Sequence, residues 1–75
     1  MENVLDSKAS ARILTELRGR KSQKEVADAL GISVSALSMY ENGERIPRDN
    51  IKIRLANYYQ KNISDIFFIT RTHET

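Results

Sequence analysis

The chain contains no cysteine, which excludes disulfide bonds and thiolate metal sites and is typical of a protein from a reducing compartment. Its single histidine, His73, lies near the end of the chain, so we expect neither a metal site nor a cofactor. No apolar run approaches the roughly 20 residues that a membrane-spanning helix needs. The first residues, Met1 to Asp6, are acidic and lack the layout of a signal peptide. These absences predict a cytoplasmic protein.

The 75 residues are enough for one domain and too few for two. Apolar residues make up 40% of the chain and charged residues 29%, a balance typical of a folded domain rather than a disordered one. Carboxylates such as Glu25, Asp28 and Glu41 are scattered along the chain without an accompanying nucleophile. No enzymatic activity is therefore expected.

The net charge of +2 does not by itself indicate a nucleic-acid partner, but the basic residues are clustered. The two clusters are Arg18, Arg20, Lys21 and Lys24, and then Arg45, Arg48, Lys52 and Arg54. Such clusters suit contact with phosphate groups. Two solvated faces of a small domain would give the same pattern, so the clusters alone leave both interpretations open.

Apolar residues recur at helical spacing along the chain, and no stretch alternates convincingly as a strand. The pattern predicts an all-α domain of five helices over residues 7–69, between an N-terminal segment (1–6) and a flexible C-terminal tail (70–75). We expect the small residues Ala9, Ser10 and Ala11 to let another element approach the first helix closely. In the fifth helix, Ile63, Ile66 and Phe67 are expected to face inward.

Residues 22–42 have the signals of two short helices joined by a tight turn. Ser22 and Glu25 form a capping box, Gly31 can end the first helix, and Ser33 can cap the second. Because the turn is short, the helices must cross steeply, and shared apolar residues would fix that angle. The residues expected to do so are Ala27, Leu30, Ile32 and Leu37, with Tyr40 also on the inner face.

The same stretch resembles the Cro/C1-type helix-turn-helix family, also called the XRE family. The residues that carry the resemblance are Ser22–Ala27, Leu30–Ser33, Leu37–Gly43 and Arg45–Pro47, and the likeness covers roughly residues 11–67. It implies a compact, lambda-repressor-like DNA-binding domain. Most members of the family are transcriptional repressors or other regulators that bind operator DNA as dimers.

The resemblance assigns roles to individual residues. Base contacts are expected from Gln23, Val34, Ser35, Ser38 and Met39. Contacts to the sugar-phosphate backbone are expected from Ser22, Lys24, Ser33, Asn42, Gly43, Arg45 and Arg48. Arg18 and Glu41 match an ion pair that ties the first helix of the family to the third. The sequence departs from the family at three places. The connection after Arg18 is shorter than usual, Gln60 stands where glycine is common, and Lys52 stands where most members have an apolar residue.

The resemblance makes the helix after Ser33 the recognition helix, the one that enters the major groove. Arg, Lys, Asn and Gln make most specific base contacts, but the outward positions of this helix carry none of them. Val34 and Met39 can touch thymine methyl groups, and Gln23 is the one strong bidentate candidate. The sequence therefore predicts discrimination through methyl contacts, water and DNA shape.

Apolar residues beyond the DNA-binding face predict a homodimer, because one small module gives little selectivity alone. The expected interface residues are Ile53, Tyr58, Phe68 and Ile69. The leading interpretation is a repressor that binds a two-fold symmetric stretch of double-stranded DNA. The alternative is an antitoxin-like module that mainly holds an unidentified protein partner and binds DNA secondarily.

Overall fold

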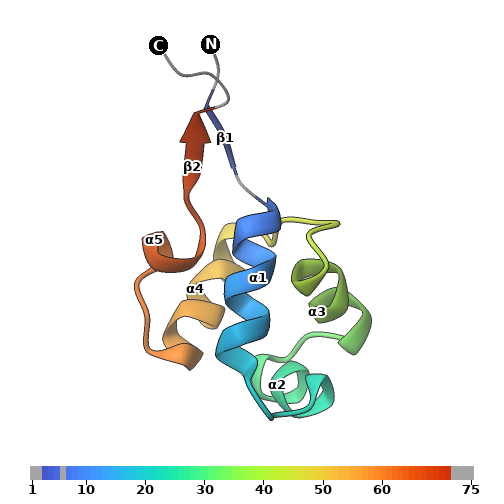
Figure 1. Ribbon diagram of the computed structural model, residues 1–75. Coiled ribbons are helices and arrows are strands. Elements are labelled where there is room, and N and C mark those ends of the chain that lie inside the picture. The colour runs from blue at the N-terminus through green and yellow to red at the C-terminus, as the bar shows by residue number, and fades with distance from the viewer. Residues whose placement is uncertain (1–2, 6, 72–75) are drawn as a thin grey trace.

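The computed structural model describes the backbone of residues 3–5 and 7–71, and the side chains of residues 7–68. It contains five helices: α1 (Ser7–Arg18), α2 (Gln23–Leu30), α3 (Val34–Glu41), α4 (Asp49–Tyr59) and α5 (Ile63–Ile66). Two short strands, β1 (Asn3–Leu5) and β2 (Ile69–Arg71), lie at the ends of the chain (Figure 1). The predicted five-helix fold is confirmed. Among the described residues, no helix is long and apolar enough to cross a membrane.

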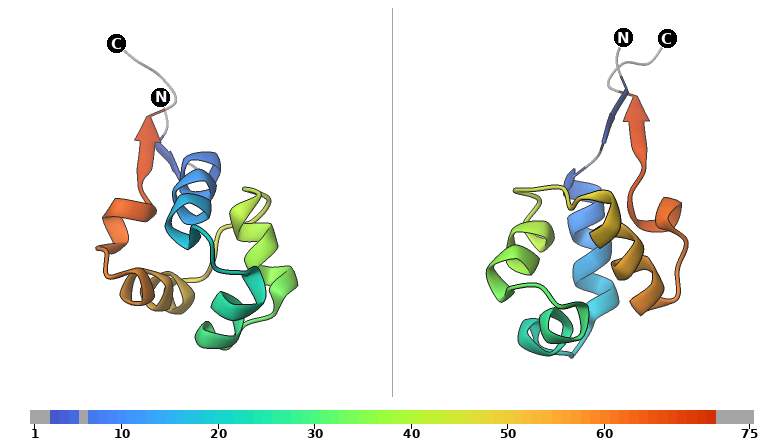
Figure 2. Two further views of the ribbon diagram at one scale, coloured as in Figure 1. Left: turned by 60° about the horizontal axis from the view of Figure 1, so that its bottom comes forward. Right: turned by 180° about the vertical axis from the view of Figure 1, so that it is seen from behind.

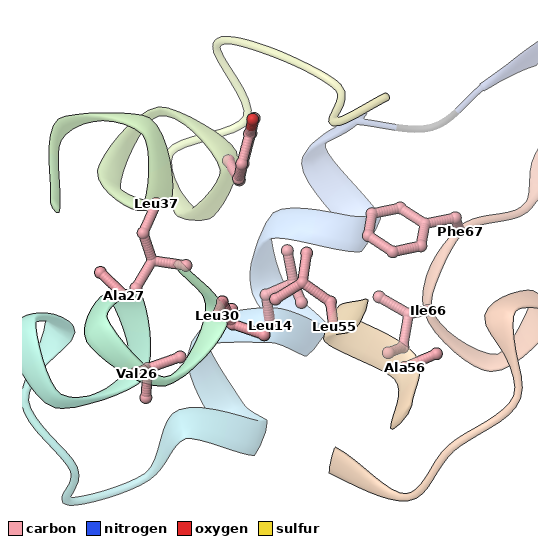
Figure 3. Packing of buried hydrophobic residues seen from close by; sticks show 10 residues of the cluster. Leu14, Val26, Ala27, Leu30, Leu37, Leu55, Ala56, Ile66 and Phe67 are labelled. Carbon is pink, nitrogen blue, oxygen red and sulfur yellow. The ribbon is translucent and has the colours of Figure 1, made fainter. Parts of the chain in front are cut away.

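Helix α1 runs through the middle of the domain, with α2 and α3 on one side and α4 and α5 on the other (Figure 1). Each helix contributes side chains to one core, in which Leu14, Val26, Leu37, Leu55 and Ile66 are almost fully buried (Figure 3). Because α1 contacts both α3 and α5, it connects the two sides of the domain. The helix-turn-helix unit therefore rests on a core that the whole chain builds.

The small side chains at the start of α1 do permit close approach, as predicted. The Ser10 hydroxyl is buried and donates a 2.7 Å hydrogen bond to the carbonyl oxygen of Ile66 at the end of α5. On another side of the same turn, a Cβ added to Gly43 would lie 3.6 Å from the Cβ of Ala11 and 3.4 Å from the Ser7 carbonyl oxygen. These are ordinary van der Waals distances, but Gly43 has a φ of +75°, so a side chain there would strain the backbone.

The pattern of the sequence did not indicate the two short strands, and β2 includes Thr70 and Arg71 of the expected C-terminal tail. Strands β1 and β2 pair antiparallel, with Val4 opposite Thr70 and Leu5 opposite Ile69. Figures 1 and 2 show this terminal β-ribbon projecting from the helices at the end of the molecule away from α2. Strands of three residues are too short for alternation to be read from sequence, and their pairing joins opposite ends of the chain. Only the folded helical domain brings those ends together.

The fifth helix differs from expectation in one residue. Ile66 and Phe67 are buried as predicted, but Ile63 is 40% exposed, so its predicted inward orientation was wrong. The helix has only four residues, and the Asp65 carboxylate accepts a hydrogen bond from the Asn62 backbone N–H at its start. Ile63 and Ile66 have the spacing of residues on one helix face, so the exposure of Ile63 comes from its place as the first residue of α5, where it lines the open groove between α4 and α5.

The turn after α4 is strained, because the chain has Gln60 at a position where the family commonly has glycine. Gln60 has a φ of +58°, and no other non-glycine residue of the described chain has a positive φ. We expect Gln60→Gly to raise the free energy of unfolding by about 1 kcal/mol, because glycine adopts this conformation without a Cβ clash. Urea denaturation would measure the change. Asn57→Gly, in the exposed interior of α4, should instead lower the free energy of unfolding by about 0.3 kcal/mol, the difference in helix propensity between asparagine and glycine. If Gln60→Gly also lowered the free energy of unfolding, the backbone at Gln60 would not be strained.

Candidate nucleic-acid interface

Local hydrogen bonds fix the starts of α2 and α3 and the turn between them, although of the predicted capping box the described structure has only the bond to the Ser22 hydroxyl. The Ser22 hydroxyl accepts a 3.0 Å hydrogen bond from the Glu25 N–H, and the Ser33 hydroxyl accepts one of the same length from the Ala36 N–H. Between them, Gly31 has a φ of +71°, and the Ile32 N–H donates to the Ala27 carbonyl oxygen at 3.0 Å. These caps satisfy backbone groups at both helix starts and fix where each helix begins.

The angle between the two helices is set by buried side chains. Ala27 and Leu37 are both 0% exposed and face each other in the core (Figure 3). A residue larger than alanine at position 27 would hold the helices apart, since the site is completely enclosed. Tyr40 is also buried on the inner face of α3. The predicted helix-turn-helix packing is therefore present.

The opposite side of α3 is accessible. Val34 is 40% exposed, Ser35 is exposed, and Ser38 and Met39 are half-buried. Asn42, at the end of the helix, donates from Nδ2 to the Ser38 hydroxyl at 3.4 Å. The first turn of α3 thus offers the outward side chains, which is the part of a recognition helix that enters the major groove.

A buried polar junction ties α1, α2 and α3 together. Arg18 Nε donates to both carboxylate oxygens of Glu41, at 2.9 and 3.1 Å, and the Glu41 side chain is only 3% exposed. Gln23 Nε2 donates to the same carboxylate at 2.9 Å. Arg18 also donates from Nη1 to the Lys21 carbonyl oxygen at 2.6 Å. The ion pair implied by the resemblance is therefore formed, and the short connection after Arg18 does not prevent it.

A profile of the helix-turn-helix family of Cro/C1, or XRE, type matches residues 14–66. The chain belongs to this family. Its members are DNA-binding transcription regulators. Comparisons with curated proteins and with solved structures gave no match. The matched segment begins inside α1 and ends with α5, so the terminal β-ribbon lies outside the part that defines the family.

The two basic clusters are largely taken up by internal contacts. Arg54 donates from Nη1 to the Leu30 carbonyl oxygen at 3.1 Å, so it caps the end of α2. Lys52 lies 3.6 Å from an Asp49 oxygen and over the Phe67 ring. Arg18, Lys21 and Lys24 have polar partners as well. Within the described side chains, the members of the two clusters that are exposed and make no hydrogen bond or ion pair are Arg20, Arg45 and Arg48.

Two of the expected dimer residues, Ile53 and Tyr58, lie in different surroundings on α4. Ile53 is 47% exposed and lies with Ile63 beside a groove between α4 and α5 that Phe67 also lines. Tyr58, five positions further along α4, points elsewhere: its hydroxyl accepts from Lys21 Nζ at 3.2 Å, and its ring is 5.0 Å from that of Tyr59. Phe68 is half-buried, and the side chain of Ile69 lies outside the described residues. Ile53 and Ile63 together make an apolar patch that the sequence did not predict.

Tyr59, which helical spacing places on the same face of α4 as Leu55, is half-buried and packs against the core. Its hydroxyl is buried and has no hydrogen-bond partner among the described residues. Burial raises the pKa of Tyr59 to about 12, and the nearby Glu41 carboxylate adds to the rise because it repels a phenolate. Helical spacing could place Tyr59 inward, but no sequence pattern says that its hydroxyl would end beside the junction.

We expect Tyr59→Phe to raise the free energy of unfolding by about 1 kcal/mol at neutral pH, because it removes a buried hydroxyl without a partner.

The raised pKa of Tyr59 also makes the wild type lose stability as pH rises from about 10 to about 12, since Tyr59 ionises at a lower pH in the unfolded chain than in the folded protein. The phenylalanine variant should lack this part of the alkaline loss. Urea midpoints between pH 7 and 12 would check both effects, with Tyr58→Phe as the matched control. A loss at neutral pH in Tyr59→Phe would show that the hydroxyl stabilises the fold.

Proposed function

We propose that the protein is a transcriptional repressor that binds a two-fold symmetric operator as a homodimer. The observation that carries the proposal is the accessible first turn of α3, held by a packed helix-turn-helix unit. Val34 and Ser35 are exposed there, while Leu37 is fully buried behind them. In this geometry the outward residues of α3 reach base edges and α2 crosses the DNA backbone. The operator would be met in the cytoplasm.

The base-reading residues in this proposal are Gln23, Val34, Ser35, Ser38 and Met39. They offer small hydroxyl groups, two apolar side chains and one amide, so discrimination rests on thymine methyl contacts, water and DNA shape. The backbone contacts are assigned to Ser22, Lys24, Ser33, Asn42, Gly43, Arg45 and Arg48. Lys24 is paired with Asp28 at 2.8 Å, but both side chains are largely exposed, so a phosphate can replace the carboxylate at little cost.

The homodimer in this proposal uses the apolar patch of Ile53 and Ile63. One module of this size covers only about 600–1,000 Å² on DNA, which limits its selectivity, and a second copy doubles the contact. Two large aliphatic side chains exposed on one groove are costly to leave in water. Sedimentation of wild type and of Ile53→Lys at tens of micromolar would test the interface. A monomeric wild type would argue against the dimer.

Arg45 and Val34 should respond differently to substitution, because one is assigned to phosphate and the other to a base. We expect Arg45→Ala to weaken all DNA sequences alike and to reduce the slope of log affinity against log salt by about 1. Val34→Ala should instead alter preference at one base pair and leave the salt slope unchanged. Titrations at several salt concentrations with specific and scrambled duplexes would separate the two. A uniform loss on Val34→Ala would contradict its role.

The proposal as a whole is tested by selecting bound duplexes from a random DNA library at near-physiological salt, followed by sequencing. An enriched two-fold symmetric motif would support sequence-specific binding by a dimer, with half-sites about one helical turn apart. An enriched motif without symmetry would support DNA reading and contradict the dimer. No enrichment would contradict the repressor proposal and favour the antitoxin-like alternative, in which a protein partner covers the patch of Ile53 and Ile63.

A further inference from the structure

The side-chain amide of Gln23 has a defined orientation in the polar junction. Its Nε2 lies 2.9 Å from Glu41 Oε1, and that oxygen also accepts from Arg18 Nε at 3.1 Å. An ionised carboxylate has no proton to donate, so only the nitrogen end of the amide can face it. The carbonyl oxygen of Gln23 must therefore point away from Glu41.

The partner that holds Gln23 is itself immobilised. The Glu41 side chain is 3% exposed, and both of its oxygens accept from Arg18. Arg18 is in turn fixed to the Lys21 carbonyl oxygen, in the loop that precedes α2. Gln23 is the first residue of α2 and is half-buried, so it belongs both to this junction and to the helix start. In contrast, Gln60, the other glutamine of the chain, is exposed and makes no side-chain hydrogen bond in the described structure.

We propose that Glu41 is a positioning residue for DNA reading, which fixes the Gln23 amide so that it offers DNA one N–H and its carbonyl oxygen. The inference rests on the proposed function, because it assigns Gln23 to the DNA contact. A phosphate oxygen only accepts hydrogen bonds, so it could use the free N–H of the amide but not its carbonyl oxygen. The N7 and N6 groups of adenine offer an acceptor and a donor side by side, which matches both free groups of the amide. Gln23 is therefore assigned to a base of this class. The bond to Glu41 fixes the amide beforehand, so the base contact does not have to restrict its rotation.

The first test uses the wild-type protein in solution, where side-chain ¹⁵N relaxation compares the amides of Gln23 and Gln60. We expect the order parameter of Gln23 to be close to that of rigid backbone, about 0.85, and that of Gln60 to be below about 0.6. Equal mobility of the two amides would overturn the proposal. This measurement needs neither DNA nor a variant, so it stands even if a substitution in the junction prevents folding.

The second test is a double-mutant cycle on DNA affinity with Gln23→Ala, Glu41→Ala and the double variant, at a temperature where circular dichroism shows all four proteins folded. An alanine at position 41 removes the oxygen that accepts from Gln23 Nε2, so the fixed orientation of the amide is lost. We expect Glu41→Ala to weaken the selected operator about tenfold when Gln23 is present and less than about twofold when it is absent. It should also reduce the preference at one base pair, which a merely structural loss would not do.

Equal losses in the two backgrounds would show that Glu41 acts only on stability, and the positioning role would be wrong while operator binding stands. A wild type that selects no DNA sequence would instead overturn the proposed function together with this inference. Gln60→Ala is the matched control. It should change neither affinity nor preference, because its amide has no partner in the described structure.

Discussion

Replacing Glu41 by alanine is expected to lower the free energy of unfolding by about 3 kcal/mol, because it leaves the Arg18 guanidinium largely enclosed without its counter-charge. The carboxylate is 3% exposed and accepts from Arg18 and Gln23, so its loss strands donors on two helices. The Arg18 side chain is 20% exposed, and water can solvate part of it, which places the effect at the lower end for buried pairs. Urea denaturation followed by circular dichroism would measure the change.

The surface pair of Lys24 and Asp28 provides the matched control for this prediction. The two side chains are 77% and 63% exposed at a separation of 2.8 Å, and Asp28→Ala should change stability by less than about 0.5 kcal/mol. The double variant Arg18→Met with Glu41→Leu should be closer to wild type than Glu41→Ala, since neither charge is then left alone. If Glu41→Ala costs no more than Asp28→Ala, the junction does not stabilise the fold.

Replacing Leu37 by alanine should have the other large effect, a loss of about 3–4 kcal/mol in the free energy of unfolding. Leu37 is 0% exposed and fills the contact between α2 and α3 next to Ala27 (Figure 3). Its removal leaves a cavity that a domain of 75 residues has few side chains to fill. We also expect weaker operator binding at temperatures where the variant remains folded, because the cavity frees the angle between the two helices.

Val34→Ala, in the same helix, should show the reverse pattern. Val34 is 40% exposed, so its truncation should alter stability by less than about 0.5 kcal/mol while changing base preference. Thermal melts and operator titrations on both variants would separate packing from reading. A Leu37→Ala protein as stable as wild type would mean that the α2–α3 contact is not held by this side chain.

The sequence alone determined the local parts of this protein. The helix starts at Ser22 and Ser33 and the stop at Gly31 were predictable because each depends on hydrogen bonds or a φ angle within a few residues. The burial of Leu37 and Tyr40 followed from helical spacing. The family resemblance rested on these same local signals, and it also gave the pairing of Arg18 with Glu41.

Apart from the pairing of Arg18 with Glu41, only the tertiary structure decided which polar groups meet. The basic clusters looked alike in sequence, yet Arg54 caps α2 while Arg45 makes no hydrogen bond or ion pair in the described structure, because the partner of Arg54, Leu30, lies 24 positions away in the chain. The bond from Gln23 to Glu41 and the burial of the Tyr59 hydroxyl likewise depend on how separate helices pack. The terminal β-ribbon forms because the helical core brings the two chain ends together. Nearby residues determine where each helix begins and ends. Contacts between helices depend on residues far apart in the chain, and a local sequence pattern does not specify which of them meet.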